Sequence, residues 1–135
     1  MQDNTNIDIV RKIYRDFVSG DIDAVLDAMD NNVLWSGRVN WRGGPQSLPY
    51  QGTYEGRSGV AECFRSFLGT VQYERPLGDT HYFSSGNHVL ATGQDIRRIL
   101  ATGELTEHRW SMFWTFNEGK VVRIRIYEDT VEVLE

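Results

Sequence analysis

The first part of the chain predicts two helices from the spacing of its apolar side chains. Apolar residues recur every three or four positions over residues 7–18, which is the spacing of a helix with one buried face. Thr5 begins a sequence that resembles a capping box, and Gly20 is suited to end this helix. Asp21 can then cap a second, shorter helix, whose apolar side chains lie between residues 22 and 29.

A short strand and a long loop are expected next. The polar residues 30–32 should end the second helix, and residues 33–35 have the character of a strand at the edge of a sheet. Residues 36–56 contain five glycines and two prolines, a composition that disfavours regular structure. This predicted loop also carries the large side chains of Trp41 and Tyr54, so it is either the rim of a pocket or a surface loop held by its own aromatic residues.

The rest of the chain predicts one more helix and an antiparallel sheet. Between Val60 and Val71 the apolar residues again follow helical spacing. Four runs rich in β-branched and aromatic residues then follow, separated by short turn sequences, at 80–85, 88–100, 105–116 and 120–129. Because short turns join neighbouring antiparallel strands, we expect a four-stranded meander with three helices on one face, an α+β domain that spans residues 1–135.

Charge and composition exclude several classes of partner. The 14 Lys and Arg residues are outnumbered by 19 Asp and Glu, which gives a formal charge of -5, whereas nucleic-acid-binding domains usually carry a basic face. No stretch approaches the roughly 18 apolar residues of a membrane span, and the first residues do not resemble a secretion signal. We therefore expect a cytoplasmic protein that binds neither nucleic acid nor a membrane.

The residue types that bind metals or form disulfides predict no further site. The only cysteine, Cys63, falls on the apolar face of the third predicted helix, where its thiol should simply pack. The three histidines, His81, His88 and His108, match no metal-binding motif. We expect no metal ion and no other cofactor.

Two of the predicted strands bring polar groups to one face of the sheet. A turn at residues 101–104 would place Arg97 opposite His108 and Asp95 opposite Trp110. Because side chains alternate between the two faces of a strand, all four would point the same way. This face is a candidate acid–base site.

Three segments of the chain together resemble the SnoaL-like branch of the nuclear transport factor 2-like superfamily. They are SGDIDAVLDAMDNNVLW, YQGTYEGRSGVAECFRSFL and FWTFNEGKVVRIRIYED, and the similarity runs from about residue 5 to residue 133. The resemblance implies a cone-shaped α+β barrel, in which three N-terminal helices pack on a strongly curved, mainly antiparallel sheet. It also implies a deep apolar pocket between helices and sheet and, very often, a homodimer across the outer face of the sheet.

Most catalytic residues of the known branches are missing from this chain. The catalytic Tyr of ketosteroid isomerases would fall at Ile13, and their acidic oxyanion donor would fall at Met112. The cyclases that give the SnoaL branch its name also place an acid near Met112. In the limonene epoxide hydrolase branch, the Arg and the two Asp that hold the water and the epoxide would fall at Gly93, Asp95 and Ile126, so that only Asp95 matches.

The resemblance places the polar face in the pocket and suggests roles for its residues. Asp95 would be the general base or hold a water molecule, His108 would shuttle protons, and Arg97 would bind a substrate oxygen or stabilise developing negative charge. Arg97 would also weaken Asp95 as a base, so a positioning role or a purely structural ion pair is the alternative. The expected ligand-binding residues are Tyr14, Trp35, Trp41, Tyr54, Trp110, Met112, Trp114 and Ile126.

These features predict a small-molecule enzyme of the SnoaL-like type, which uses cofactor-free acid–base chemistry on an apolar, oxygen-bearing ligand. The reaction classes are isomerase, cyclase, hydrolase or lyase; the alternative is a non-catalytic ligand-binding or dimerisation module of the same fold. A homodimer through the outer sheet face is expected from the outward side chains of Ser111, Phe113 and Thr115. Tyr127 and Asp129 in the last strand are expected to be structural.

Overall fold

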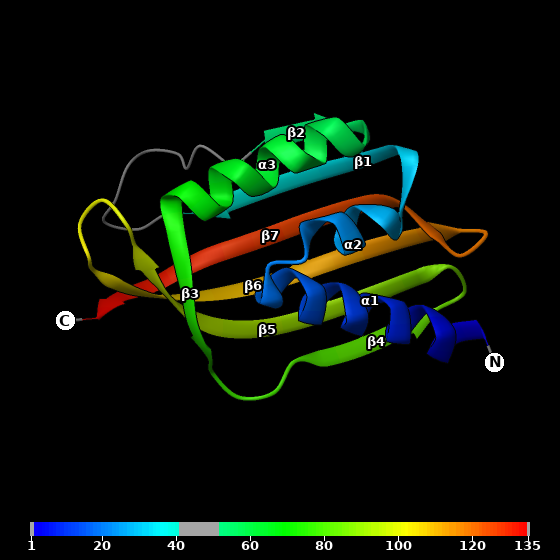
Figure 1. Cartoon of the computed structure of the whole chain (residues 1–135). Coiled ribbons are helices and arrows are strands. Elements are labelled where there is room, and N and C mark those ends of the chain that lie inside the picture. The colour runs from blue at the N-terminus through cyan, green and yellow to red at the C-terminus, as the bar shows by residue number, and fades with distance from the viewer. Residues whose placement is uncertain (1, 41–51, 135) are drawn as a thin grey trace.

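The computed structural model describes residues 2–40 and 52–134 and places three helices against one face of a curled sheet (Figure 1). The helices are α1 (Gln2–Ser19), α2 (Ile22–Asp27) and α3 (Gly56–Thr70). The strands are β1 (Met29–Asn40), β2 (Gly52–Glu55), β3 (Val71–Pro76), β4 (His81–Ser85), β5 (His88–Ile99), β6 (Leu105–Asn117) and β7 (Lys120–Leu134). The expected α+β class, with helices on a mainly antiparallel sheet, is confirmed.

The first two helices are separated by the residues that the sequence indicated. Gly20 adopts a φ of +87°, a left-handed conformation that suits glycine, and it follows the last residue of α1. Asp21 caps α2, because its Oδ1 accepts a hydrogen bond from the backbone N–H of Ala24 at 3.2 Å. The start of α1 differs from the prediction: the helix begins at Gln2, so Thr5 lies inside it rather than at its cap.

The strand after α2 is longer than predicted and lies inside the sheet. β1 runs from Met29 to Asn40, whereas the sequence predicted a strand over residues 33–35 at an edge. It pairs antiparallel with β2 on one side and parallel with β7 on the other. Residues 36–40 and 52–55 of the predicted loop therefore belong to strands. β1 pairs with both β7 and β2, and these hydrogen bonds overcome the glycine-rich composition.

The sheet curls around the helices without closing. Strands β4 to β7 form the predicted antiparallel meander, and the strand order is β2-β1-β7-β6-β5-β3, with β4 also paired to β5. β3 was not predicted, because only its first residue, Val71, is buried and its sequence has no alternating pattern. It follows α3 directly yet pairs with β5, at the opposite end of the order from β2, so the sheet wraps around the helices (Figure 1).

The register of β5 and β6 differs from the prediction by two residues. Asp95 lies opposite His108, whereas the sequence analysis paired Asp95 with Trp110 and Arg97 with His108. The chain turns earlier than expected, and the backbone N–H of Gly103 donates to the carbonyl of Ile99 at 2.7 Å. Because a shift of two residues leaves every side chain on its original face, Asp95, Arg97, His108 and Trp110 still share the inner face.

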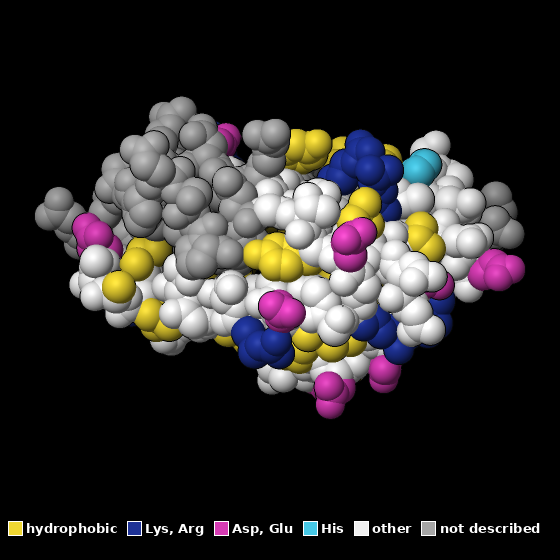
Figure 2. Space-filling view, turned by 90° about the horizontal axis from the view of Figure 1, so that it is seen from above, with side chains coloured by type: hydrophobic (Ala, Val, Ile, Leu, Met, Phe, Trp, Pro, Cys, Tyr) yellow, Lys and Arg dark blue, Asp and Glu magenta, His cyan; other side chains and the backbone are white. Residues whose placement is uncertain are grey.

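The hydrophobic core fills the space between the helices and the inner face of the sheet. Val10 of α1 and Val60 of α3 are fully buried, as are Trp114 and Ile124 of the sheet. On the face shown in Figure 2, basic side chains are interspersed with acidic ones. In the described part of the chain, none of the helices is long and apolar enough to cross a membrane.

Candidate functional site

A cavity of about 530 Å³ lies between the helices and the inner face of the sheet. Aromatic and aliphatic side chains form most of its wall, from α1, α3 and the strands of the inner face. Six of the predicted ligand-binding residues line it: Tyr14, Trp35, Trp110, Met112, Trp114 and Ile126. Tyr54 is not among the lining residues and packs against the core instead, while Trp41 lies outside the described residues.

Three charged side chains lie in this largely apolar wall. Arg97 donates from Nε to Asp95 Oδ1 at 2.8 Å and from Nη2 to Asp95 Oδ2 at 3.2 Å. Its Nη1 donates to Glu128 Oε1 at 2.8 Å, so one guanidinium holds carboxylates from two different strands. All three residues are at most 8% exposed. With the adjacent His108, they are called the polar cluster below.

His108 belongs to the polar cluster but is not among the residues that line the cavity. Its side chain is fully buried, with Nε2 2.6 Å from Thr106 Oγ1 and Nδ1 3.5 Å from Glu128 Oε2. Thr106 in turn donates to the backbone carbonyl of Arg97 at 3.3 Å. The imidazole therefore contacts Glu128 and Thr106 without lining the cavity, and its role as a proton shuttle stays a prediction.

Glu128 is the member of the polar cluster that was not predicted from the sequence. Burial favours its neutral form, but the charge of Arg97 and the contact with His108 outweigh this and lower the pKa of Glu128 to about 2. The side chain is thus an anion near neutral pH. The alternation of side chains along β7 could have indicated Glu128 from the sequence. Ile124, Ile126 and Glu128 point to the same face, while Tyr127 and Asp129 are exposed on the other.

Trp110 connects the polar cluster to the aromatic part of the cavity. Its Nε1 donates to Asp95 Oδ2 at 3.1 Å, and its ring makes an edge-on contact with Tyr14, with 5.5 Å between centroids. The Tyr14 hydroxyl donates to the sulfur of Met112 at 3.0 Å and accepts from Trp114 Nε1 at 3.3 Å. Burial raises the pKa of Tyr14, so its hydroxyl stays protonated and can donate a hydrogen bond.

Residues 10–124 match the family model described as a SnoaL-like domain. The chain belongs to the SnoaL-like family. The match covers most of the chain and confirms the resemblance that the three sequence segments indicated. No curated protein matches the sequence.

Solved structures share the fold of this SnoaL-like protein over nearly its whole length. A nuclear transport factor 2-like protein from Burkholderia xenovorans LB400 is 24% identical, with 96% of this chain and 92% of that chain covered and a TM-score of 0.81. A protein from Rhodopseudomonas palustris named as an isomerase is 17% identical, with 96% and 93% covered and a TM-score of 0.76. A protein from Xanthomonas campestris pv. campestris named as a polyketide cyclase is 18% identical, with 94% and 92% covered and a TM-score of 0.76. At these identities the likeness shows a shared fold.

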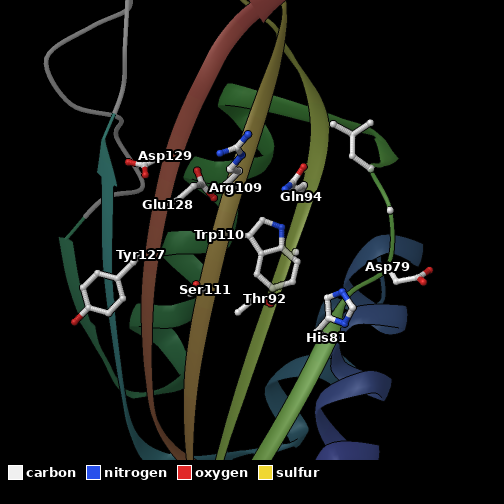
Figure 3. Close-up of a pocket in the computed structure, with 13 residues that line it drawn as sticks. Asp79, His81, Thr92, Gln94, Arg109, Trp110, Ser111, Tyr127, Glu128 and Asp129 are labelled. Carbon is white, nitrogen blue, oxygen red and sulfur yellow. The ribbon is translucent and has the colours of Figure 1, made fainter.

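A second hollow of about 1110 Å³ lies on the outer face of the sheet of the SnoaL-like protein, opposite the helices (Figure 3). Polar side chains form much of this outer groove, which runs over β5, β6 and β7. They include Asp79, His81, Thr92, Gln94, Arg109 and Asp129. None of the predicted catalytic residues lines the outer groove, so the inner cavity is the candidate functional site.

Proposed function

We infer that this SnoaL-like protein is a small-molecule enzyme that performs cofactor-free acid–base chemistry on an apolar, oxygen-bearing ligand. The observation that carries the inference is the placement of Asp95, Arg97 and Glu128 in the wall of an otherwise aromatic and aliphatic cavity. Buried charges in such a wall are costly unless they are paired, and they are common where a site needs reactive groups. Neighbours of the same fold named as an isomerase and a polyketide cyclase agree with this interpretation.

Asp95 is the residue best placed to act on a ligand. A carboxylate has about four acceptor positions, and hydrogen bonds from Arg97 and Trp110 use three of those of Asp95. The remaining position can accept a proton or a hydrogen bond from a water molecule or a ligand hydroxyl. The two bonds from Arg97 fix the orientation of the Asp95 carboxylate, which favours its use in orienting the reacting group.

Tyr14 and the deeper members of the polar cluster have supporting roles in this proposal. Tyr14 lines the cavity, and its hydroxyl can turn its proton from the sulfur of Met112, a weak acceptor, to the ligand oxygen. Arg97 can stabilise negative charge that develops there. His108 acts on the ligand only through its neighbours, since the imidazole does not line the cavity, whereas Glu128 lines the cavity and also holds Nη1 of Arg97.

A non-catalytic ligand-binding module is the second candidate function. The three hydrogen bonds that Asp95 accepts favour it, because an ion pair satisfied in this way needs no ligand to complete it. In both candidates the cavity binds a small apolar molecule.

Exchange with isotopically labelled water tests catalysis across several classes of oxygen-bearing compound at once. Wild type, Asp95→Asn and Asp129→Asn would each be incubated with a panel of cyclic ketones, enones and epoxides in deuterated or oxygen-18 water, and products followed by mass spectrometry. We expect label incorporation by wild type and by Asp129→Asn, whose exposed carboxylate lies in the outer groove, and a loss of about 100-fold or more in Asp95→Asn. Equal rates in Asp95→Asn and wild type would exclude catalysis by this residue.

A homodimer through the outer face of the sheet is part of the same proposal. Tyr127 is 54% exposed there, and His88 stacks on Phe113 with 5.0 Å between ring centroids, which leaves a partly aromatic surface. Analytical ultracentrifugation at micromolar concentration should give twice the mass of the chain. A Phe113→Asp variant should then sediment as a monomer, and a monomeric wild type would contradict the proposal.

A further inference from the structure

Large apolar side chains that are exposed gather at the inner cavity. Among the described residues these side chains are Val18, Leu68, Tyr73, Phe83, Leu100 and Tyr127. The first three and Leu100 line the inner cavity, whereas Phe83 and Tyr127 do not. Val18, Leu68, Tyr73 and Leu100 are called the rim below; they are 61%, 48%, 37% and 47% exposed, respectively.

The rim is assembled from four separate parts of the chain. Val18 and Leu68 lie near the carboxyl ends of α1 and α3, Tyr73 lies on β3, and Leu100 follows the last residue of β5. The backbone N–H of Leu100 donates to the carbonyl of Thr70, the last residue of α3, at 3.0 Å. α3, β3 and β5 meet where α3 leads into β3 and β3 reaches β5 (Figure 1), and Phe17, next to Val18 in α1, packs on Phe67 of α3. What the four side chains share is therefore the cavity, not a helix face or a strand.

The rim also lies beside the polar cluster. Tyr73 is the register partner of Arg97, and the guanidinium of Arg97 lies over the ring of Phe67, 5.2 Å from its centroid. Phe67 is the neighbour of Leu68 in α3. Further along the inner face, beyond Trp110, the cavity wall continues to Met112 and Trp114. Apolar wall is thus present on both sides of the polar cluster.

We propose that the ligand of this cavity is an elongated molecule with a polar, oxygen-bearing group between two apolar parts, of which the second lies on the rim. The position of the oxygen-bearing group at the polar cluster rests on the proposed function; the apolar part on the rim does not. Soluble proteins keep clusters of exposed apolar side chains where a binding partner covers them. The rim is too small for a stable contact between two copies of the chain, which uses about 20–30 residues on each side.

A series of 4-alkylphenols from ethyl to decyl, measured by titration calorimetry, tests the apolar part on the rim, because the hydroxyl supplies the oxygen-bearing group and the alkyl chain supplies that part. Each methylene that leaves water for an apolar surface strengthens binding about fourfold. We expect the affinity of the wild-type protein to rise along the whole series, because the chain passes from the cavity onto the rim. An affinity that stops rising at the shorter chains would contradict the proposal.

Substitutions at the rim provide the matched comparison. Leu68→Ser and Val18→Ser should bind the short phenols like wild type and bind the decyl phenol about tenfold or more weakly. Phe83→Ser is the control, since Phe83 is 58% exposed but does not line the cavity, and it should follow wild type along the whole series. Equal behaviour of Leu68→Ser and Phe83→Ser would overturn the proposal. Thermal unfolding of each variant verifies that it is folded.

Three further outcomes separate this proposal from its alternatives. If Leu68→Ser converts a dimer into a monomer in ultracentrifugation, the rim is a contact between copies and the proposal is wrong. If the chain-length dependence is found but Asp95→Asn catalyses label exchange like wild type, the ligand proposal stands and catalysis by Asp95 fails. If the rim variants bind every phenol like wild type while Asp95→Asn is inactive, the ligand proposal is wrong and catalysis by Asp95 stands.

Discussion

Gly93 on β5 lies directly opposite Trp110 on β6, and the indole ring occupies the space that a larger residue at position 93 would need. A Cβ atom at this position would lie 2.5 Å from Trp110 Cζ2, which is too close for either atom to remain in place. The ring is held there by its hydrogen bond to Asp95 and its contact with Tyr14. Because Gly93 has no side chain, the indole N–H of Trp110 can reach the carboxylate of Asp95, which lies two residues after Gly93 on β5.

We predict that Gly93→Ala moves the Trp110 ring and breaks its hydrogen bond to Asp95. Overpacking of this kind costs about 1–3 kcal/mol, which urea unfolding can measure. The indole N–H signal of Trp110, assigned with Trp110→Phe, should shift in the NMR spectrum of the variant.

Gly37→Ala is the control for this substitution. Gly37 also lines the inner cavity, but a Cβ there meets nothing within 4 Å. Its stability should match that of wild type or exceed it slightly, because alanine has fewer conformations in the unfolded chain. An unchanged Trp110 signal in Gly93→Ala would show that the ring is not held in this position.

Replacement of Glu128 by Gln should destabilise the fold, because Arg97 and His108 then lose a buried anion. Removing one partner of a buried ion pair costs about 3–5 kcal/mol, and we expect the lower end because the amide oxygen of Gln can still accept a hydrogen bond from Arg97. Urea unfolding measures this free energy. Asp129→Asn, at an exposed neighbouring position, should change it by less than about 0.5 kcal/mol. Equal effects of the two substitutions would contradict the assigned role of Glu128.

Much of the fold could be predicted because its signals are local. The apolar spacing of α1 and α3, the cap at Asp21 and the short turns between β4 and β7 each depend on a few neighbouring residues. The missed features depend on distant partners. β1 continues to Asn40 because β7, about 90 residues later in the sequence, pairs with it, and β3 is an edge strand whose exposed side chains give no alternating pattern.

The candidate site was predictable in part for a related reason. The strict alternation of side chains along a strand put Asp95, Arg97 and His108 on one face even though their predicted register was wrong by two residues. The distance of each residue from the cavity was not predictable, since it depends on how the sheet curls. His108 therefore joins the polar cluster without lining the cavity, and Glu128 was passed over although it alternates with Ile124 and Ile126.

The lowered pKa of Glu128 predicts a pH dependence of stability. The pKa is about 2 in the folded protein and 4.5 is the ordinary value, so the unfolded chain binds the proton more readily. The stabilisation by Glu128 is therefore complete above about pH 4.5 and is lost as the pH falls towards 2. The difference in unfolding free energy between wild type and Glu128→Gln, measured by urea unfolding from pH 7 to pH 2.5, should shrink over this range. A difference that does not change with pH would show that Glu128 is not an anion held by Arg97.

Cys63 offers a chemical test of the closed packing around α3. Its side chain is 3% exposed, and burial raises the pKa of the thiol to about 12, so almost none of the reactive thiolate exists at neutral pH. We expect iodoacetamide to label the native protein at pH 8 at least about 100-fold more slowly than the protein unfolded in urea, as measured by mass spectrometry. Ser85→Cys in a Cys63→Ser background supplies an exposed thiol for comparison and should react at a similar rate in both states. Because Cys63 also lines the inner cavity, a bound 4-alkylphenol should slow the reaction of the native protein further. If native Cys63 were labelled at the rate of the exposed thiol, α3 would not pack on the sheet as described.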